Sequence, residues 1–362
     1  MIPGHSTLIG IGIGLLCAGA TPAAEKPVVE EVNIASPVAA LAGTLVIPPG
    51  RAKTPCAVLL GGSLSHTRDG AMTRPGVPKR DALKRLAEAL LADGYASLRF
   101  DRVGFGTSKP SAAWRGTYSD EAAAAAAVIR FARGRKEFDK IIVIGESAGA
   151  YVACLAAKAG ATGDAYVFLG ALCGPSESLY AYTFGGLVKW AESSPERLAW
   201  AKTTVRHELA LGRTYKAMLA AAAKGDDTFP MVDGEYQARV GGLARRREEA
   251  KMPPDEMFRH VTAPALCLAG TRDLNTPLGH AAAATEAMRA AGNAADDAIL
   301  IAGADHNFQI ASADPDVRMR ERYTFQSFSR PYDPRLYKEL GDWLKKTVPP
   351  GNARRAVSLC RQ

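Results

Sequence analysis

The chain has 362 residues, of which 47% are apolar and 23% are charged, so it is long and apolar enough to bury a substantial core. These numbers exclude a small disulfide-stapled module, a disordered chain and a protein that crosses the membrane many times, and they favour a soluble globule. The formal net charge is +8, yet the basic residues are scattered and not interleaved with aromatic residues, so we expect no nucleic-acid partner.

The first 24 residues have the pattern of an export signal. Residues 8–20 form an apolar stretch that is too short to span a bilayer but suits the core of a signal peptide. Small residues up to Ala24 offer a cleavage site, so we predict a signal peptide at 1–24 and an exported protein, periplasmic or secreted, with no stable membrane insertion after cleavage. The leading residues contain no Lys or Arg, and a retained anchor, a lipid anchor or a disordered end are the alternatives.

Five cysteines lie beyond residue 24. One is Cys360, and the other four occupy apolar runs, in which a buried free thiol behaves as a small hydrophobic group. No Cys or His spacing resembles a zinc site, so we expect no metal. The sequence decides neither whether any cysteines pair nor the oligomeric state. The four cysteines in apolar runs are Cys56, Cys154, Cys173 and Cys267.

Seven short apolar or β-branched runs follow one another along the chain, with helical segments between them. This alternation predicts an α/β fold, doubly wound, with a mostly parallel sheet. The helices expected from apolar periodicity and breakers are 79–92, 119–132 and 335–346. The expected strands are 44–47, 57–60, 96–100, 141–144, 165–169, 265–268 and 298–301.

The alternation breaks between residues 174 and 260. This stretch has no convincing strand, and its Ala, Leu and Arg residues recur at helical spacing among several aromatic residues. We predict a core domain of 25–173 and 261–362, and a helical cap at 174–260 that could act as a lid. Within the cap, residues 245–249 (RRREE) are expected to form a solvated helix face. The aromatic residues either roof a pocket or pack the cap onto the core.

A serine lies at a sharp turn between a strand and a helix. The segment Gly145-Glu146-Ser147-Ala148-Gly149 follows the strand at 141–144 and precedes small helix-forming residues. A Gly-x-Ser-x-Gly turn in this context is typical of a nucleophile elbow. The two glycines allow neighbouring segments to pass close by, and the helix start directs N–H groups at developing negative charge. An ordinary strand-to-helix turn is the alternative.

A serine hydroxyl is a poor nucleophile unless a histidine takes its proton and a carboxylate orients that histidine. Both types follow in that chain order, each in a loop after an expected strand: Asp273 and His306. A helix N-cap is the alternative role of Asp273. Asp305 is a rival for the carboxylate, which we disfavour because neighbouring side chains in a loop point apart. His66 also follows a strand and is a candidate substrate contact.

The negative charge of a tetrahedral intermediate needs two preset N–H groups, an oxyanion hole. In elbow sites one comes from the residue after the nucleophile, here Ala148, and the other from the loop after an early strand. That loop reads Gly61-Gly62-Ser63-Leu64-Ser65. We expect the second N–H from Ser63, with Leu64 as the fallback, and a Gly-Gly turn without catalytic duty is the alternative.

Three further segments carry a family resemblance: 68–70 (RDG), 98–108 (LRFDRVGFGTS) and 303–308 (GADHNF). Over about 40–173 and 258–346 the chain resembles α/β-hydrolase fold proteins, in particular bacterial acyl hydrolases often grouped with serine aminopeptidases. The resemblance implies an eight-stranded sheet, no cofactor, and a triad of Ser147, Asp273 and His306.

The sequence therefore predicts a serine hydrolase that cleaves a small carboxylic ester through an acyl-enzyme on Ser147. An aminopeptidase or amidase with the same triad is the alternative, which we disfavour because no acidic residue of the cap is recognisable as an anchor for a substrate amine. A binding protein that keeps the fold without catalysis is a second alternative, since a fold alone does not establish activity. The sequence does not decide the physiological substrate.

Overall fold

The computed structural model describes residue 1 and residues 25–50, 53–296 and 298–351. The expected signal peptide, apart from Met1, and Cys360 lie outside the described residues. Within the described ranges, no helix combines the length and the apolar character that a membrane crossing requires. The four described cysteines, Cys56, Cys154, Cys173 and Cys267, are buried and free.

A single large sheet forms the centre of the molecule, with strand order β1-β2-β4-β3-β6-β7-β10-β11. The last six strands of this path run parallel, whereas β1 pairs with β2, and β2 with β4, in antiparallel register. A short β5 pairs with β2 beside the path. These pairings confirm the prediction of a doubly wound, mostly parallel sheet with eight main strands. The strands are β1 (Val28–Ala35), β2 (Ala39–Ile47), β3 (Thr54–Leu60), β4 (Ala96–Phe100), β5 (Lys109–Pro110), β6 (Phe138–Glu146), β7 (Ala165–Leu169), β10 (Ala265–Gly270) and β11 (Ile299–Ile301).

Strand β1 was not expected from the sequence. Its residues alternate between exposed and buried only toward its end, and two adjacent acids, Glu30 and Glu31, interrupt the apolar pattern. Both acids form ion pairs, with Arg135 and Arg68 respectively. Because β1 is an edge strand, it tolerates charges that would exclude it from the centre of the sheet.

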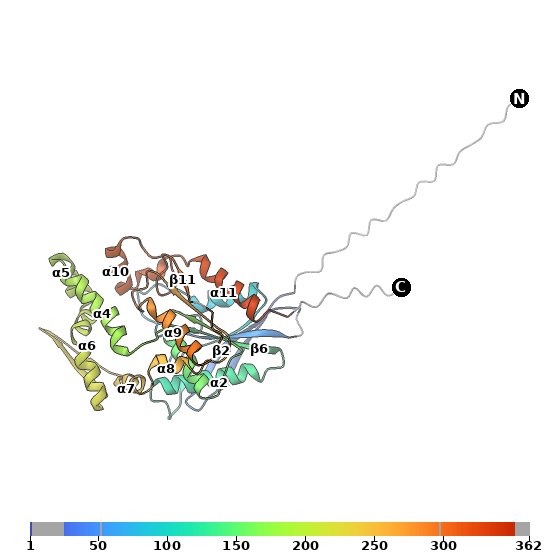
Figure 1. The fold of residues 1–362 in the computed structure, drawn as a ribbon, viewed down its shortest axis with the longest axis horizontal. Helices are drawn as coiled ribbons and strands as arrows, with labels where there is room; N and C mark the ends of the chain where they lie inside the picture. Colours follow the sequence, from blue (N-terminus) through green and yellow to red (C-terminus); the bar gives the residue numbers. More distant parts are fainter. Residues whose placement is uncertain (2–24, 51–52, 297, 352–362) are drawn as a thin grey trace.

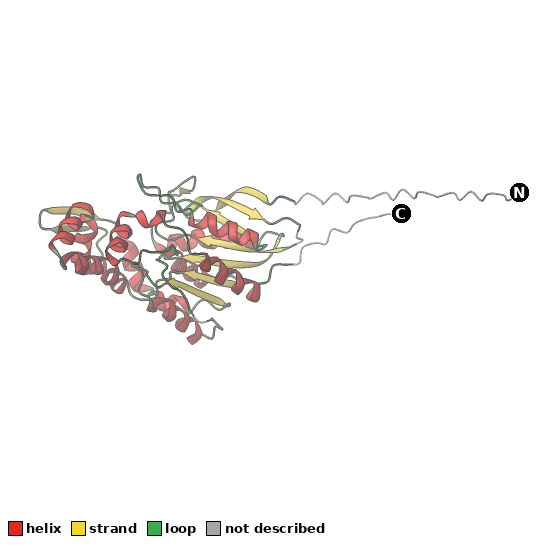
Figure 2. Ribbon diagram, turned by 90° about the horizontal axis from the view of Figure 1, so that it is seen from above, coloured by secondary structure: helices red, strands yellow, loops and turns green. Residues whose placement is uncertain are grey.

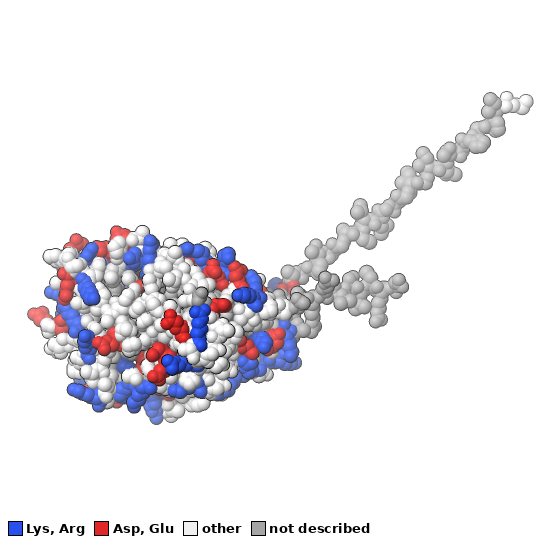
Figure 3. All heavy atoms as spheres, viewed as in Figure 1, with Lys and Arg blue, Asp and Glu red and all other residues white. Residues whose placement is uncertain are grey.

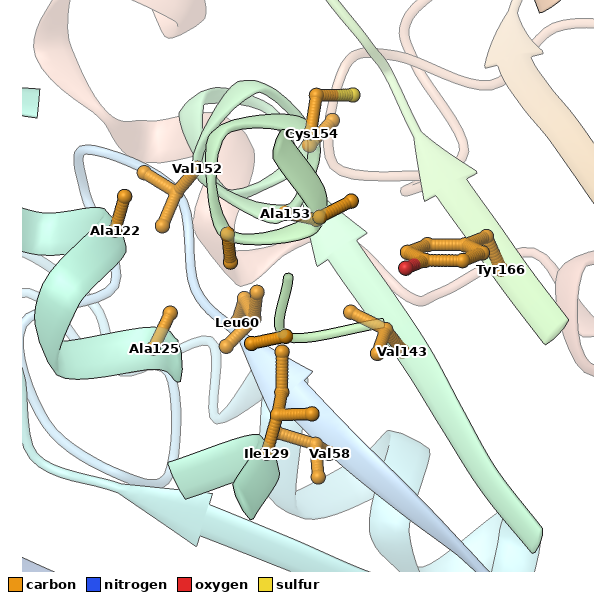
Figure 4. Close-up of a cluster of buried hydrophobic side chains, with 14 of the residues drawn as sticks. Val58, Leu60, Ala122, Ala125, Ile129, Val143, Val152, Ala153, Cys154 and Tyr166 are labelled. Atoms are coloured by element: carbon orange, nitrogen blue, oxygen red, sulfur yellow. The ribbon is translucent and has the colours of Figure 1, made fainter. Parts of the chain in front are cut away.

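Each face of the sheet is covered by its own hydrophobic cluster, because successive side chains of a strand point to opposite faces. In β3, Val58 and Leu60 belong to the cluster beneath α2, α3, α8 and α9, whereas Ala57 and Leu59 belong to the one beneath α1 and α11. Figure 2 shows helices on both sides of the strands, and Figure 4 shows α2 and α3 side chains meeting those of β3 and β6. These helices are α1 (Ala82–Ala92), α2 (Tyr118–Arg133), α3 (Ala148–Lys158), α8 (Pro254–Phe258), α9 (Gly279–Ala290) and α11 (Pro334–Thr347).

The segment between β7 and β10 is a cap built on hydrophobic clusters of its own. Two clusters hold its helices together, and they share no residue with the clusters on the two faces of the sheet. Helix α10 of the body packs on the cap: the Arg320 guanidinium lies over the rings of Trp190 and Trp200. Figure 1 shows α10 beside the cap helices. The elements involved are α4 (Ser176–Glu192), α5 (Pro195–Thr204), α6 (Arg206–Lys224), β8 (Phe229–Asp233), β9 (Tyr236–Val240), α7 (Leu243–Lys251) and α10 (Pro315–Thr324), which precedes a 3₁₀ turn (Gln326–Ser329).

The prediction of a purely helical insertion at 174–260 is wrong in one respect. Strands β8 and β9 form an antiparallel hairpin in which Asp233 pairs with Tyr236, so the loop has two residues. The first of these, Gly234, has φ 59°, a value that glycine adopts without strain. A glycine at the first loop position was the available signal for this hairpin, but only Met231 of β8 is fully buried, so the apolar pattern is weak. In addition, Met257 and Phe258 of α8 pack into the body.

Acidic and basic side chains are interspersed over the face drawn in Figure 3. The excess of 45 basic over 37 acidic residues is therefore not gathered into one tract on that face.

Candidate active site

Ser147 lies between the last residue of β6 and the first residue of α3, with φ 52° and ψ −118°. Such a backbone is strained for a residue with a side chain, and it persists only where the surrounding structure enforces it. A Cβ atom on Gly149 would lie 2.1 Å from the carbonyl oxygen of Leu60, and one on Gly145 would lie 2.6 Å from the Cα of Ala150. The two flanking glycines therefore permit the close packing that holds the turn.

Asp273 and His306 meet although they lie in loops after different strands. Asp273 follows β10, His306 follows β11, and Asp273 Oδ2 lies 2.7 Å from His306 Nδ1. The second oxygen of Asp273 accepts hydrogen bonds from the backbone N–H groups of Asn275 and Thr276, at 2.6 and 2.9 Å. Both side chains are buried. The carboxylate is thus fixed so that it orients the imidazole.

Asp305, the rival carboxylate, points elsewhere. Its Oδ1 accepts the backbone N–H groups of Asn307 and Gln309, at 2.8 and 2.9 Å. Burial raises the pKa of Asp305 to about 6. Asp305 therefore closes its own loop, and the contact with the His306 ring belongs to Asp273.

A cavity of about 230 Å³ opens where body and cap meet, and Ser147 and His306 both line it. The hydroxyl of Ser147 makes no hydrogen bond with another described residue, and catalytic hydrogen bonds of this kind often tighten only in the complex with substrate. The cap contributes Leu179, Tyr180 and Phe184 to the walls. The cap thus adds apolar and aromatic side chains to the cavity wall, beside the polar and charged side chains that also line it.

Ser63, Leu64 and Ala148 also line this cavity. None of their N–H groups donates a backbone hydrogen bond to another described residue, so each remains available to an incoming oxygen. The preceding Gly62 approaches Ser147 so closely that a Cβ on it would lie 2.9 Å from Cβ of Ser147. Its N–H donates to Glu146 Oε2 at 3.1 Å, which leaves Ser63 and Leu64 as the loop's candidate donors.

A buried ion pair next to Ser147, between Arg80 and Glu146, was missed by the sequence analysis. Arg80 donates to Glu146 Oε1, to Asn307 Oδ1 at 2.7 Å, and to Ser65 Oγ. Burial pushes the pKa of Glu146 upward, but the charge of Arg80 and the hydrogen bonds outweigh it, so the pKa lies below its ordinary value. The pair therefore joins the loop after β3, through Ser65, to the loop that carries His306, through Asn307. An acid at the end of a buried strand was the available signal, since it requires a buried cation.

The prediction that residues 245–249 form a solvated face is wrong, because all five are buried or partly buried. Glu249 is buried, and Arg246 donates to its Oε2 at 2.6 Å. The Arg246 guanidinium also lies 5.8 and 5.7 Å from the ring centroids of Tyr118 and Tyr180. Three consecutive arginines on a helix point in different directions, and of these three Arg246 lines the cavity. Arg246 and Glu249 both line the cavity, so the cap does place an acidic residue in the cavity that Ser147 lines.

His66 lies outside this cavity. Its ring stacks on Phe105 with centroids 4.0 Å apart, and its Nδ1 lies 3.0 Å from Thr73 Oγ1. In the loop that follows β3, Ser63 and Leu64 line the same cavity as Ser147, and His66 does not. Among the described residues, no three His, Cys, Asp or Glu side chains are grouped as metal ligands.

A sequence family described as serine aminopeptidase, S33, matches residues 80–310, more than half of the chain. The chain belongs to this family of α/β-hydrolases. Its match includes the elbow, Asp273 and His306. No curated protein sequence gives a significant match.

Solved α/β-hydrolases share the fold of this family member at low sequence identity. Est1E from Butyrivibrio proteoclasticus is 14% identical, with a TM-score of 0.52 over 88% of this chain and 98% of its own. An esterase from Pyrococcus furiosus, Pf2001, is 17% identical, with a TM-score of 0.51 over 92% and 95%. DcsB, solved with a substrate analogue, is 15% identical, with a TM-score of 0.53 over 89% and 100%. At these identities the likeness establishes the fold alone.

Proposed function

We propose that this hydrolase cleaves carboxylic esters through a covalent acyl-enzyme on Ser147. The observation that carries the proposal is that His306, hydrogen-bonded to the buried Asp273, lines the same cavity as a serine held at a strained elbow. This set of groups contains a nucleophile, a base and an orienting carboxylate, which is the minimum for serine-based acyl transfer.

The proposed reaction has two halves. Ser147 Oγ attacks the ester carbonyl carbon while His306 Nε2 takes the hydroxyl proton, and the bond between the carbonyl carbon and the alcohol oxygen then breaks as His306 returns that proton to the leaving alcohol. Water attacks the acyl-enzyme by the same route and releases the acid. Asp273 remains ionised and stabilises the imidazolium, while the N–H groups of Ala148 and of Ser63 or Leu64 bind the oxyanion.

An aminopeptidase or amidase is the second candidate, and one observation favours it. Glu249 lines the cavity, and its Oε1 is buried without a hydrogen-bond partner, so it offers the acidic group that a substrate amine would need. Its other oxygen is engaged by Arg246, which weakens its pull on a cation. We place the ester first because an ester needs less protonation of its leaving group than an amide does.

The test of the proposal is a substrate panel with an active-site label. Purified protein is expected to hydrolyse p-nitrophenyl acetate, butyrate or octanoate faster than amino-acid anilides, and a fluorophosphonate is expected to label the unmodified protein but not Ser147→Ala. Faster turnover of anilides would move the assignment to the amidase. A folded protein that takes no label would be a binding protein on a hydrolase fold.

We also propose that the cap acts as a lid that sets the acyl-chain preference, since Leu179 of α4 lines the cavity. Shortening it to Ala enlarges an apolar wall, so the ratio of kcat/KM for octanoate to that for acetate should rise, by about tenfold or less. Leu198→Ala, in α5 and outside the cavity lining, is the matched control and should leave the ratio unchanged. An equal ratio in Leu179→Ala and the unmodified protein would show that residues other than Leu179 set the acyl-chain preference.

A further inference from the structure

The charges that line the active-site cavity do not cancel. Two of its three arginines are matched by carboxylates: Arg80 by Glu146 and Arg246 by Glu249. The third, Arg322, forms no ion pair with a carboxylate in the part of the chain that the structure describes. The cavity therefore has one uncompensated guanidinium, half-buried, within the same wall as His306.

Arg322 is held by one hydrogen bond and by a cation–π contact, in which its guanidinium lies 5.0 Å from the ring centroid of Tyr323. It lies on α10, and its Nε donates to Asn275 Oδ1, in the loop that carries the catalytic acid. Asn275 is itself fixed to the cap, because its carbonyl oxygen accepts the Thr183 hydroxyl at 2.7 Å. The two terminal nitrogens of Arg322 make no hydrogen bond with another described residue. These nitrogens form a fork that suits the two oxygens of a carboxylate.

A smaller cavity behind Arg322 adds to the positive potential. It shares His306, Asn307 and Arg322 with the main cavity. Arg272 and Arg318, which also line it, donate only to main-chain carbonyl oxygens of Ala311, Ser312 and Ala313.

The Nε of Arg318 is buried without a partner, and burial together with the nearby Arg272 lowers the pKa of Arg318. The carboxylates facing this smaller cavity are Asp305 and Glu321, and Glu321 is paired with Arg330. Within the described part of the chain, Asp305 is thus the one carboxylate of this lining without an ion pair, and it faces three guanidinium groups that also form no ion pair: those of Arg272, Arg318 and Arg322.

We propose that the substrate is an ester that carries a carboxylate, and that Arg322 binds this carboxylate. The proposal rests on the proposed ester hydrolysis and names its substrate class. A carboxylate that enters the cavity supplies the partner that Arg322 lacks, at a distance from Ser147 that the cavity itself limits. Charge-assisted hydrogen bonds of this kind discriminate strongly against a neutral analogue, which leaves the guanidinium desolvated and unpaired.

Two pairs of esters test the proposal on either side of the scissile bond. The acyl side is tested with p-nitrophenyl hydrogen glutarate against p-nitrophenyl methyl glutarate, and the alcohol side with para-carboxyphenyl butyrate against its methyl ester. Each kcat/KM is measured for the unmodified protein, for Arg322→Gln and for Arg320→Gln, with Ser147→Ala supplying the background rate. Arg320 lies on the same helix but outside the cavity lining and packs on cap tryptophans.

In at least one pair, the unmodified protein is expected to prefer the carboxylate ester on the order of tenfold. Arg322→Gln should lose most of that preference, and Arg320→Gln should keep it. The pair that responds tells which side of the ester bears the carboxylate. Absence of a preference in both pairs, or a preference that survives in Arg322→Gln, overturns the proposal.

Failure of the proposed function gives a different result, because then the neutral esters are not hydrolysed either. In that case calorimetric titration with glutarate decides the role of Arg322. Binding that weakens about tenfold in Arg322→Gln supports the carboxylate site. No binding, or equal affinity in the two proteins, overturns it.

Discussion

Replacing Asp273 by Asn is expected to lower kcat for a p-nitrophenyl ester about 10⁴-fold, because an amide in place of the carboxylate no longer holds the imidazole in the productive tautomer. The reason is local: Asp273 Oδ2 contacts His306 Nδ1 at 2.7 Å, and Oδ1 accepts two backbone N–H groups that an amide oxygen can still accept. The loop should therefore keep its shape. Circular dichroism and a urea titration check the fold, and steady-state kinetics give kcat.

Asp305→Asn is the matched control, since it makes the same chemical change one residue from His306. Its kcat should fall less than tenfold, because Asp305 contacts backbone amides and not the imidazole. Burial raises the pKa of Asp305 from 3.8 to about 6, so the folded protein binds this proton more tightly than the unfolded chain. The contribution of Asp305 to the unfolding free energy should therefore fall as pH rises from about 4 to 6, and the variant should lack this contribution. A large loss of kcat in Asp305→Asn, together with nearly full kcat in Asp273→Asn, would show that Asp305 and not Asp273 orients the imidazole.

Replacing Arg80 by Met is expected to lower the unfolding free energy by about 3–5 kcal/mol at neutral pH, because it leaves the buried Glu146 without its counter-charge. The variant should also hydrolyse esters more slowly. Arg80 holds Ser65, in the loop from which we expect an oxyanion donor, and Asn307, the residue after His306. Urea unfolding and steady-state kinetics measure the two effects. Lys84→Met is the control, because Lys84 and Glu88 form an exposed pair at 4.0 Å that contributes at most about 1 kcal/mol.

The double variant Arg80→Met with Glu146→Leu separates stability from activity. Removing both charges should recover part of the lost stability, but not the activity, because Glu146 Oε2 also accepts the N–H of Gly62 at 3.1 Å. An Arg80→Met protein as stable as the unmodified one would show that water or another group compensates Glu146. Full activity in the double variant would mean that the loop after β3 keeps its position without the hydrogen bonds of Arg80 and Glu146.

The central part of the fold was predictable because its signals are local. The parallel strands are short apolar runs with a helix between them, and β3 is buried along its whole length. Edge strand β1 and the β8–β9 hairpin gave weak signals, because an edge strand and a two-stranded hairpin bury little and carry charges such as Glu31 and Asp233. Helix α1 begins at Ala82, three residues later than expected, because Asp81 has φ 46°.

The residues proposed for the chemistry were identified from the sequence because each lies directly after an apolar strand. The partners that hold and surround them were not, because their contacts join distant parts of the chain. Arg80 and Asn307 are 227 residues apart in sequence, and nothing near either one signals the other. Arg322 lies in an unremarkable polar helix, and only the folded chain places it in the cavity beside His306.

The separation of hydrophobic clusters between body and cap has an evolutionary consequence. Substitutions in structurally separate clusters have nearly additive effects on stability, so the roof of the cavity can change while the sheet that carries Ser147 and His306 stays intact. Helix α10 is the exception, because its Tyr323 packs in a cap cluster next to Arg322. With the proposed role of the cap, lineages of this fold could change their substrates through the cap while the residues proposed for bond cleavage stay in place. Changes in α10 would alter both the packing of the cap and the proposed carboxylate site at Arg322.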